Sequence, residues 1–410
     1  MTSPNCQGCA APLSSTWVDL GMSPLANSNV PADLADQIDR TYPLHAFVCG
    51  TCFLVQVPPV VPADEIFNSD YAYFSSYSES WLRHCHAYVA EMTTRFDLGE
   101  HSQVVEIASN DGYMLQYFVE HGVPVLGVEP ARNTAEVAIA KGIPTEIRFF
   151  GVKTARDLVA RGFSADLLAA KNVMAHVPDI NDFVGGVAAI LKSDGVFTVE
   201  FPHILNTIRF VQFDQIYHEH YTYLSLITVQ GILTRHGLRV FDVVEQKTHG
   251  GSLRVFACRA ESIHETTENV NRVLDEERSA HLDKLDGYVG FDAHVQTVRA
   301  NLKAFIAQAR HEEKSVACYG AAAKGNTLIN YCGLGIGDIT IIADRSAAKQ
   351  GMLAPGSHIP IVSPEALSDA KPDYVLILPW NLATEIKAQM AAVRDWGGRF
   401  VTAIPTLEID

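Results

Sequence analysis

The run Gln103-Val104-Val105-Glu106-Ile107-Ala108, followed at once by Ser109-Asn110-Asp111-Gly112, decides the fold of this chain. Its first part is a short apolar run with the length of a buried strand, and its second part is a tight turn. We expect a helix over 113–121 and then another strand over 123–128, which ends at Glu129. Strand, turn, helix and strand in this order predict a doubly wound α/β unit.

The two ends of this unit indicate the kind of cofactor. Glu129 lies at a distance from the first turn that suits a nucleoside ribose, because a carboxylate can accept both ribose hydroxyls. The segment from Glu106 to Gly112 lacks the Gly-x-Gly-x-x-Gly pattern that lets a backbone approach a diphosphate. The sequence therefore predicts a nucleoside cofactor without a diphosphate and argues against NAD or FAD.

Two later strands are predicted to end beside the same crevice. The strand that begins at Ala165 carries Asn172 and His176 at its carboxyl end, and the next one ends in Glu200 and His203. The ligand crevice of an open α/β sheet lies outside the carboxyl ends of its strands. We therefore expect these side chains to converge with Glu106 and Glu129.

A hairpin is predicted to complete the sheet. The runs 238–244 and 252–258 are strand-like and are joined through Thr248-His249-Gly250-Gly251. As a terminal antiparallel pair they would complete a methyltransferase-like sheet. The charge-rich residues near 264–312 are then expected to form a solvated helical connector.

The stretch Phe213-Asp214-Gln215-Ile216-Tyr217-His218-Glu219-His220-Tyr221-Thr222-Tyr223 holds the densest group of ionisable side chains. In an extended chain His218 and His220 share one side, and in a helical turn Tyr217 and His220 share a face. Either way an imidazole has a phenol or a carboxylate beside it, as a general base near neutral pH requires. His-x-His with Glu219 could instead bind a metal, or the cluster could be a buried hydrogen-bond network.

The N-terminal segment contains two Cys-x-x-Cys pairs, Cys6 with Cys9 and Cys49 with Cys52. A glycine inside each pair lets backbone amides turn toward the sulfurs, and two such pairs form a tetrahedral thiolate cage for structural zinc. The other four of the 8 cysteines stand singly in apolar sequence, so we expect them to be packing residues and not disulfides.

A second strand, turn and helix follow in the C-terminal third. The strand 315–319 leads into Gly320-Ala321-Ala322-Ala323-Lys324-Gly325-Asn326, a later strand ends at Asp344, and another ends at Pro379-Trp380-Asn381. This order predicts a second Rossmann-like unit. Its turn is no Walker A site, because it reads Lys-Gly where that motif has Gly-Lys. It either holds nucleotide phosphates at the helix N-terminus, with Lys324 as counter-charge, or only stabilises the fold.

The size and charge of the chain narrow its function class. At 410 residues it should form two or three domains, and 31 basic against 47 acidic residues give a net charge of −16. This charge argues against a general nucleic-acid or anionic-membrane surface. Neither a membrane-spanning apolar run nor a leader is expected, so the sequence predicts a cytoplasmic protein, and a monomer is compatible with it.

The paired cysteines, the Tyr71-Ala72-Tyr73-Phe74-Ser75-Ser76-Tyr77-Ser78 stretch, the Rossmann unit, Tyr-His-Glu-His and Gly-Ala-Ala-Ala-Lys-Gly-Asn occur in a characteristic order. In this order the chain resembles, over essentially its whole length, the S-adenosylmethionine-dependent sugar C-methyltransferases. These enzymes act on nucleotide-linked 4-keto deoxysugars, typically at C3. The resemblance implies an α/β architecture with a zinc-binding module (1–70), a class I Rossmann-like methyltransferase domain (71–262) and a C-terminal Rossmann-like domain (263–410) that helps bind the nucleotide sugar.

The resemblance also implies roles for individual residues. Zinc is held by Cys6, Cys9, Cys49 and Cys52. His220 falls on the proposed base, and the surrounding catalytic shell is Tyr217, Glu219, His176 and Tyr71, with Glu219 orienting or supporting a histidine. Contacts to S-adenosylmethionine are expected from Glu106, Ala108, Asn110, Asp111, Gly112, Glu129, Pro130, Asn172 and Val173. Contacts to the nucleotide sugar are expected from His203, Asn206, Gly250, Gly251, Arg254, Lys324, Asn326, Asp344, Trp380 and Asn381.

The expected chemistry is carbon methylation. A ketone at C4 acidifies the hydrogen on C3, His220 removes it, and the enolate attacks the sulfonium methyl in line, with Tyr217 or His176 as donors toward the oxyanion. Three alternatives stay open from the sequence: a nicotinamide-dependent sugar oxidoreductase, a non-enzymatic zinc scaffold, and an O- or N-methyltransferase acting on another small molecule.

Overall fold

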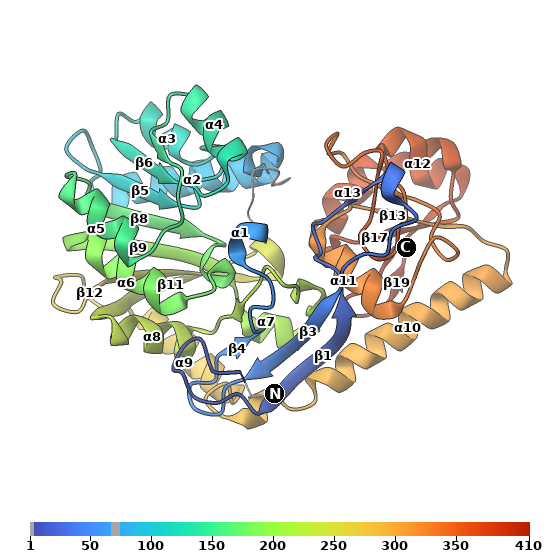
Figure 1. Cartoon of the computed structure of the whole chain (residues 1–410), viewed down its shortest axis with the longest axis horizontal. Coiled ribbons are helices and arrows are strands. Elements are labelled where there is room, and N and C mark those ends of the chain that lie inside the picture. The colour runs from blue at the N-terminus through green and yellow to red at the C-terminus, as the bar shows by residue number, and fades with distance from the viewer. Residues whose placement is uncertain (1–3, 67–73) are drawn as a thin grey trace.

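The computed structural model describes residues 4–66 and 74–410. Two α/β lobes stand beside each other in Figure 1, and the N-terminal strands and one long helix join them along one side. The first lobe carries the early Rossmann unit and the second carries the C-terminal unit.

The first lobe is built on a seven-stranded sheet. Its order is β11 (Leu238–Gln246), β12 (Ser252–Arg259), β9 (Leu191–Pro202), β8 (Ala165–Lys171), β5 (Val104–Ile107), β6 (Val125–Val128) and β7 (Thr145–Glu146). Only β12 runs antiparallel to its neighbours. This is the class I methyltransferase sheet, and it confirms both the predicted α/β fold and the predicted terminal hairpin.

Helices cover both faces of this sheet, and all four residues of β5 are buried, including the charged Glu106. The described helices of this lobe are α2 (Glu79–Arg95), α3 (Leu115–Glu120), α4 (Arg132–Ala140), α5 (Val152–Ala160), α6 (Ile180–Ile190), α7 (Ile204–Arg209), α8 (Leu226–Arg235) and α9 (Glu268–Ser279). α2 begins directly after the Tyr/Ser stretch.

The second lobe contains a six-stranded sheet, as the second Rossmann-like unit predicts. Its order is β16 (Ile361–Val362), β14 (Ile342–Ala343), β13 (Val316–Tyr319), β17 (Tyr374–Ile377), β18 (Arg399–Thr402) and β19 (Glu408–Ile409), and only β19 is antiparallel. Its helices are α11 (Ala323–Cys332), α12 (Pro364–Ala370) and α13 (Ala383–Gln389). The strand that ends before Asp344 is shorter than the sequence suggests, because only two of its residues pair.

The N-terminal segment does not close its own sheet. β1 (Ser15–Ser23), β3 (Tyr42–Val48) and β4 (Val55–Gln56) form a sheet whose fourth strand, β10 (Thr222–Tyr223), follows the Tyr-His-Glu-His stretch. β2 (Val30–Pro31) pairs instead with β15 (Met352–Leu353) of the second lobe. The short helix α1 (Ala63–Ile66) ends this segment. The N-terminal strands therefore contact both lobes.

The connector predicted near 264–312 is helical, but one face of it is buried. Its main helix, α10 (Phe291–His311), starts near β1 and runs along the lower side of the second lobe in Figure 1. Phe291 stacks on Trp17 of β1, with ring centroids 4.2 Å apart. Among the described residues, no helix combines the length and apolar character that crossing a membrane would need.

Candidate active site

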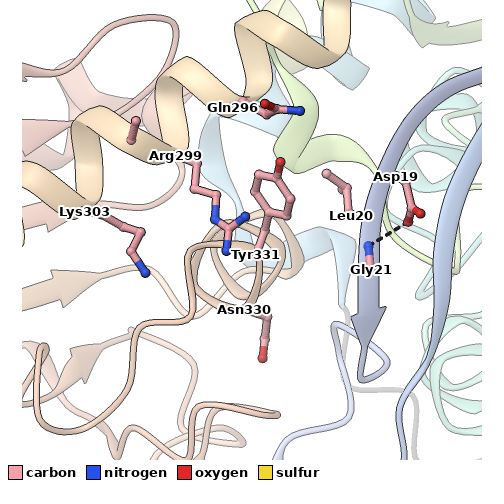
Figure 2. A pocket seen from close by; sticks show the side chains of 9 residues that line it. Asp19, Leu20, Gly21, Gln296, Arg299, Lys303, Asn330 and Tyr331 are labelled. Atoms are coloured by element: carbon pink, nitrogen blue, oxygen red, sulfur yellow. Dashed lines mark hydrogen bonds between the residues drawn. The ribbon is translucent and has the colours of Figure 1, made fainter.

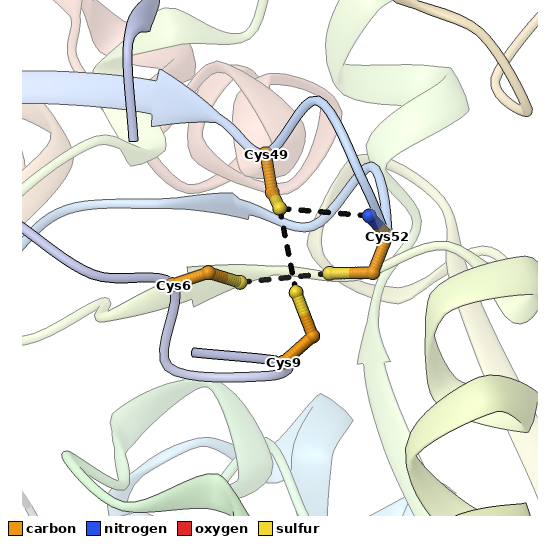
Figure 3. A group of neighbouring side chains, drawn as sticks. All are labelled: Cys6, Cys9, Cys49 and Cys52. Carbon is orange, nitrogen blue, oxygen red and sulfur yellow. Dashed lines mark hydrogen bonds between the residues drawn. The ribbon is translucent and has the colours of Figure 1, made fainter. Parts of the chain in front are cut away.

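The four paired cysteines lie together at the tip of the N-terminal segment (Figure 3). The Sγ atoms of Cys6 and Cys52 are 3.5 Å apart, those of Cys9 and Cys49 are 3.6 Å apart, and all four lie within 4.8 Å of one another. Thiolates at 2.3 Å from a tetrahedral zinc ion are about 3.8 Å apart, so the site fits zinc. Gln56 donates Nε2–H to Cys6 Sγ at 3.2 Å, as a residue that orients a metal ligand would. The other four cysteines are buried and free, as predicted.

The zinc-binding segment is connected directly to the histidine stretch. β4 begins three residues after Cys52, and its Gln56 pairs with Thr222 of β10. The backbone amide of Val57 donates to the carbonyl of Tyr221 at 2.9 Å, and the amide of Tyr221 donates to Ala175 at 2.8 Å. The metal site thus supports the backbone on which His220 stands.

His220 is held in one tautomer by its two hydrogen bonds. Its Nδ1 lies 2.7 Å from the carbonyl oxygen of Gln215, and because a carbonyl can only accept, Nδ1 carries the proton. Nε2 is therefore unprotonated and accepts from the hydroxyl of Tyr217 at 2.8 Å. The amide of His220 also donates to the carbonyl of Tyr217, so the turn conformation holds here, not the extended one. This is the arrangement of a general base.

The surroundings keep this imidazole neutral. Burial lowers the pKa of His220 well below its ordinary value, and the nearby imidazoles of His176 and His249 and the ammonium of Lys324 lower it further. The rings of His176 and His220 are 4.5 Å apart and nearly perpendicular. Burial also lowers the pKa of His176 to about 4, so both imidazoles are neutral at neutral pH.

The other two residues of the motif point elsewhere. Both carboxylate oxygens of Glu219 accept from the side-chain amide of Asn27, at 2.7 and 2.8 Å, so Glu219 does not support a histidine as the sequence suggested. Burial raises its pKa to about 7. His218 lies with its ring 5.9 Å from that of Tyr42. The reason is the turn at His220, which turns neighbouring side chains in different directions. Tyr71 lies outside the described residues.

The turn after β5 compensates for its missing glycines by backbone strain. Ala108 has φ 56° and Asn110 has φ 49°, both in the left-handed region that favours glycine, and Gly112 has φ 76°. Such strain in residues other than glycine is concentrated at functional sites. Ala108 and Asn110 thus adopt the left-handed backbone that glycine would otherwise supply, which the sequence did not indicate.

Glu129 reaches this turn from the end of β6. Its carboxylate accepts from the amide of Asn110 at 2.9 Å and from that of Ala131 at 2.8 Å, and burial raises its pKa to about 7. A carboxylate at this position beside an open turn fits the ribose of S-adenosylmethionine. Glu106, at the start of the turn, is buried, and burial raises its pKa well above the usual range.

The described end of the Tyr/Ser stretch covers the same turn. The amide of Ser75 donates to the side-chain oxygen of Asn110 at 2.9 Å, and the hydroxyl of Ser76 donates to Asp111. This segment is therefore a wall of the predicted cofactor site. The remaining predicted cofactor contacts adjoin this crevice, with Pro130 directly after Glu129, and Asn172 and Val173 directly after β8.

Several predicted substrate contacts are already bound within the protein. Arg254 is buried, and its guanidinium contacts Glu200 at 2.6 Å and Glu91 at 2.8 Å, so it is not available for a phosphate. Glu200 also hydrogen-bonds to Lys171 and His84; burial opposes its charge, but the positive charges of Lys171 and Arg254 and the hydrogen bond from His84 hold its pKa well below the usual range.

The predicted substrate residues after β9 and in the turn after β11 also make contacts within the protein. Nε2 of His203 lies 2.7 Å from a carboxylate oxygen of the buried Glu277. A Cβ at Gly251 would lie 2.3 Å from Nδ2 of Asn206, and one at Gly250 would lie 2.5 Å from the ring of Trp380. These two glycines therefore allow the turn after β11 to approach both lobes closely.

Three predicted substrate-binding residues of the second lobe lie next to the histidine stretch: Lys324, Trp380 and Asn381. Lys324 lies 3.3 Å from the side-chain oxygen of Asn381 and 5.0 Å from the centre of the Trp380 ring. The indole N–H of Trp380 donates to Asp214 at 2.7 Å. Burial raises the pKa of Asp214 to about 6, and the positive charge of Lys324 opposes this shift.

Helix α11 contacts the same stretch further along. The hydroxyl of Thr327 donates to the carbonyl of Ile216 at 3.1 Å, and Asn326 donates to the carbonyl of Ala26 at 2.7 Å. Asp344 accepts from the amides of Ala321 and Ser346, each at 2.8 Å. The predicted phosphate turn is thus packed against the base-bearing segment.

Some residues near His220 had no catalytic role predicted for them. Asp214 and Gln215 lie in the quoted stretch, and His249 stands in the turn between β11 and β12, where its Nε2 is 3.0 Å from the amide nitrogen of Asn172. The ring of Trp81 lies 5.6 Å from that of His249. The only sequence signal for His249 was its place before Gly250 and Gly251.

A separate cavity of about 790 Å³ lies between β1, α10 and α11 (Figure 2). It is lined by Asp19, Leu20, Gly21, Gln296, Arg299, Ala300, Lys303, Asn330 and Tyr331. The ring of Tyr331 packs on Phe213 at 5.4 Å, at the start of the histidine stretch. None of the residues predicted for the site lines this cavity.

Comparison with known families matches three successive parts of the chain. Residues 6–67 match a zinc-binding domain model, residues 81–243 a methyltransferase domain model, and residues 247–405 a C-methyltransferase C-terminal domain model. Together with the tetrahedral cysteine cluster, these matches show a methyltransferase that uses S-adenosylmethionine and carries structural zinc.

Individual proteins are similar to this chain to different extents. C-methyltransferase NovU of Streptomyces niveus is 38% identical over 393 residues, which are 95% of this chain and 93% of the relative. A ubiquinone biosynthesis O-methyltransferase of Bartonella quintana is 28% identical over 101 residues, 24% of this chain and 41% of that one. The structure of magnesium protoporphyrin IX methyltransferase from Synechocystis PCC 6803 is 14% identical and covers 43% of this chain and 79% of its own, with a TM-score of 0.34.

Proposed function

The chain belongs to the S-adenosylmethionine-dependent C-methyltransferases with an N-terminal zinc-binding domain, and from this premise we propose that it methylates C3 of a nucleotide-linked 4-keto deoxysugar. The observation that carries the proposal is the tautomer of His220. Its Nδ1 is committed to Gln215, so the lone pair of Nε2 is available for a proton. A neutral base is what a carbon acid next to a ketone requires.

The reaction divides into two balanced steps. Nε2 of His220 takes the proton from C3, the electron pair of the broken C–H bond forms the C3=C4 double bond, and the carbonyl pair moves onto oxygen. The enolate carbon then attacks the sulfonium methyl of S-adenosylmethionine, the carbon–sulfur bond breaks, S-adenosylhomocysteine leaves and the ketone is restored. The buried site holds the reacting groups in line and excludes water.

Tyr217 and His176 have defined parts in this proposal. The Tyr217 hydroxyl occupies Nε2 of His220 in the structure, so it must turn toward the substrate before the base can act. Once turned, it can donate to the developing oxyanion. The ring of His176 packs against the base and keeps it desolvated, which favours the neutral form.

The cofactor is proposed to occupy the crevice at the carboxyl ends of β5 and β6. Glu129 would accept the ribose hydroxyls, and the strained turn at Ala108 and Asn110 would leave room for the methionine part. S-adenosylmethionine supplies the electrophilic methyl group. Asn172 and Val173 would border the methyl group from the end of β8.

The second lobe is proposed to hold the nucleotide of the substrate. Lys324, Trp380 and Asn381 lie next to Asp214 of the histidine stretch, so a sugar at His220 would place its diphosphate near them. Lys324 is the cation suited to that charge. The division into domains 1–70, 71–262 and 263–410 is part of the same proposal, with α9 of the third part packed on β11 of the first lobe.

Proton exchange in heavy water tests this function. The enzyme would be incubated with S-adenosylhomocysteine and the thymidine or uridine diphosphate form of 4-keto-6-deoxyglucose, and C3 deuteration followed by NMR. We expect exchange by the wild type and a loss of at least about 1,000-fold in His220→Asn, because general-base catalysis at this carbon disappears. His45→Asn, on β3, is the matched control and should exchange normally, because His45 is hydrogen-bonded to Thr16 and stacked on Phe47, neither of which is a predicted site residue.

The outcomes separate the alternatives. If methylation of either ketosugar proceeds in the wild type without C3 exchange, proton loss and methyl transfer are concerted. If the methylated product carries its new group on oxygen or nitrogen, the proposed acceptor is wrong. Unchanged exchange in His220→Asn would reject His220 as the base.

A further inference from the structure

His249 occupies a strained position at the tip of the turn between β11 and β12. Its φ is 53°, and the φ of its hydrogen-bond partner Asn172 is also 53°. Residues other than glycine adopt this conformation at a cost, and the cost is concentrated at functional sites. Two strained residues from different strand ends thus hold a single side-chain hydrogen bond.

This turn is connected to the base by two glutamine side chains. Gln212 donates Nε2–H to the carbonyl of Gly250 at 2.9 Å and accepts from Gln215 at 2.7 Å. The carbonyl of Gln215 in turn accepts from Nδ1 of His220 at 2.7 Å. The position of His249 relative to His220 is therefore determined by short hydrogen bonds within the buried site.

The imidazole of His249 is neutral, with a defined tautomer. Its Nε2 accepts from Nδ2 of Asn172, so the ring proton is on Nδ1, and Nδ1 bonds to none of the described residues. Burial, with help from Lys324, lowers its pKa to about 4. A neutral imidazole with a free N–H is a hydrogen-bond donor that does not surrender its proton, as an enolate site requires.

We propose that His249 donates its Nδ1 hydrogen to the ketone oxygen of the substrate and stabilises the enolate, with Asn172 as the positioning residue that selects the tautomer. The inference rests on the proposed function. As the C3–H bond breaks, negative charge moves onto the oxygen at C4, and the hydrogen bond from His249 strengthens. His220 receives the proton, and His249 keeps its own. The positive charge of Lys324 nearby favours the same oxyanion.

Two isosteric replacements test the donor. The side-chain nitrogen of asparagine can take the place of Nδ1, whereas aspartate places an oxygen there that cannot donate; both residues tolerate a left-handed backbone. We expect His249→Asn to retain C3 exchange within about 10-fold. We expect His249→Asp to lose about 100- to 1,000-fold, the usual effect of removing one oxyanion donor.

A matched control and a second readout isolate the donor role. His281, with φ 61°, is an exposed left-handed histidine outside the site, so His281→Asp should exchange at the wild-type rate. The carbonyl stretching frequency of the bound ketosugar, labelled with ¹³C at C4, reports the hydrogen bond directly. It should fall on binding to the wild type and His249→Asn, and stay near its solution value in His249→Asp.

The possible results are distinct. Equal exchange rates in the wild type and His249→Asp overturn the inference, as does equal loss in both His249 variants with an unshifted carbonyl band in each. Absence of exchange and methylation in the wild type, with both ketosugars, overturns the proposed function and this inference with it. Retained exchange in His249→Asn together with loss of exchange in His249→Asp supports the proposed function and the role of His249 as a donor.

Discussion

The two lobes hold their first turns in the same way but use them differently. In the first lobe Glu129 accepts from Asn110 of the turn and from the amide two residues after itself, at 2.9 and 2.8 Å. In the second lobe Asp344 does the same with Ala321 and Ser346, each at 2.8 Å. Both carboxylates end the strand that follows the first helix of their unit. The backbone arrangement of a nucleoside site is therefore present twice.

What differs is the surface that each turn meets. The first turn is covered by Ser75 and Ser76, short polar residues that hydrogen-bond to Asn110 and Asp111. The second turn continues into α11, whose Thr327 and Asn326 bind backbone carbonyls of the histidine stretch and the N-terminal segment. A turn of the nucleotide-binding kind can thus become a structural support when another segment occupies its open side. Four variants or conditions test this comparison.

The largest effect is expected from removing the two carboxylates one at a time. Glu129→Ala should weaken binding of S-adenosylhomocysteine at least about 100-fold, because charge-assisted hydrogen bonds to two ribose hydroxyls are each worth roughly 1.5–3 kcal/mol. Asp344→Ala is the matched control, since it exposes an equivalent pair of backbone amides. Titration calorimetry should find its affinity unchanged; an equal loss would show that the carboxylates act through folding alone.

Lys324→Met should lower kcat about 30-fold and leave the affinity for S-adenosylhomocysteine unchanged. The reason is that Lys324 supplies positive charge beside the histidine stretch, not beside the first turn. Steady-state kinetics with the ketosugar measure the change. Lys314→Met, an exposed lysine of the same lobe, serves as control and should have no effect. A loss of affinity for S-adenosylhomocysteine in Lys324→Met would show that the charge of Lys324 acts on the cofactor site and not on the histidine stretch.

Binding of S-adenosylhomocysteine should depend on pH through Glu129. Burial raises its pKa to about 7, so the carboxyl is protonated below that pH and is a weaker acceptor for ribose hydroxyls. We expect the affinity to fall about 10-fold from pH 8 to pH 6, a tenfold change per unit of pH being the limit for one proton. Glu129→Gln should bind more weakly at pH 8 and show no such dependence. A dependence that persists in this variant would assign the titration to another group.

The smallest effect is expected from one hydroxyl in each lobe. Thr327→Val removes the donor to Ile216 and should cost about 1 kcal/mol of stability, with a fall in kcat of about 5-fold. Thr134→Val removes a comparable buried bond, to Ala131 at 3.0 Å, and should cost similar stability with kcat unchanged. Urea unfolding and steady-state kinetics measure the two quantities. Equal kcat in both variants would show that α11 does not support the segment that carries His220.

Some of the site follows from local sequence because its chemistry is local. Two Cys-x-x-Cys pairs can converge on one ion whatever lies between them, and His220 and Tyr217 meet within a single turn. The strands of the first lobe were likewise predictable, since short apolar runs indicate buried strands and the polar residues that follow them mark the edge where a ligand binds.

Other parts could not be read from sequence because they depend on distant partners. Glu219 turns to Asn27, 192 positions away, and Arg254 to Glu91, 163 positions away, although each had been assigned to the active site. A charged side chain removed from water takes the partner that the fold offers, and no local pattern identifies that partner.

The sequence alone therefore determined the class of fold, the four-cysteine zinc site and the segment that carries the proposed base. Only the tertiary structure decided which tautomer His220 adopts, that Ala108 takes a glycine-like conformation, and that His249 stands beside the base. The physical reason is the separation along the chain of the residues that each feature depends on. Periodicity and motif spacing act over a few residues, whereas tautomers, strain and buried hydrogen bonds are set by contacts between segments far apart in the chain.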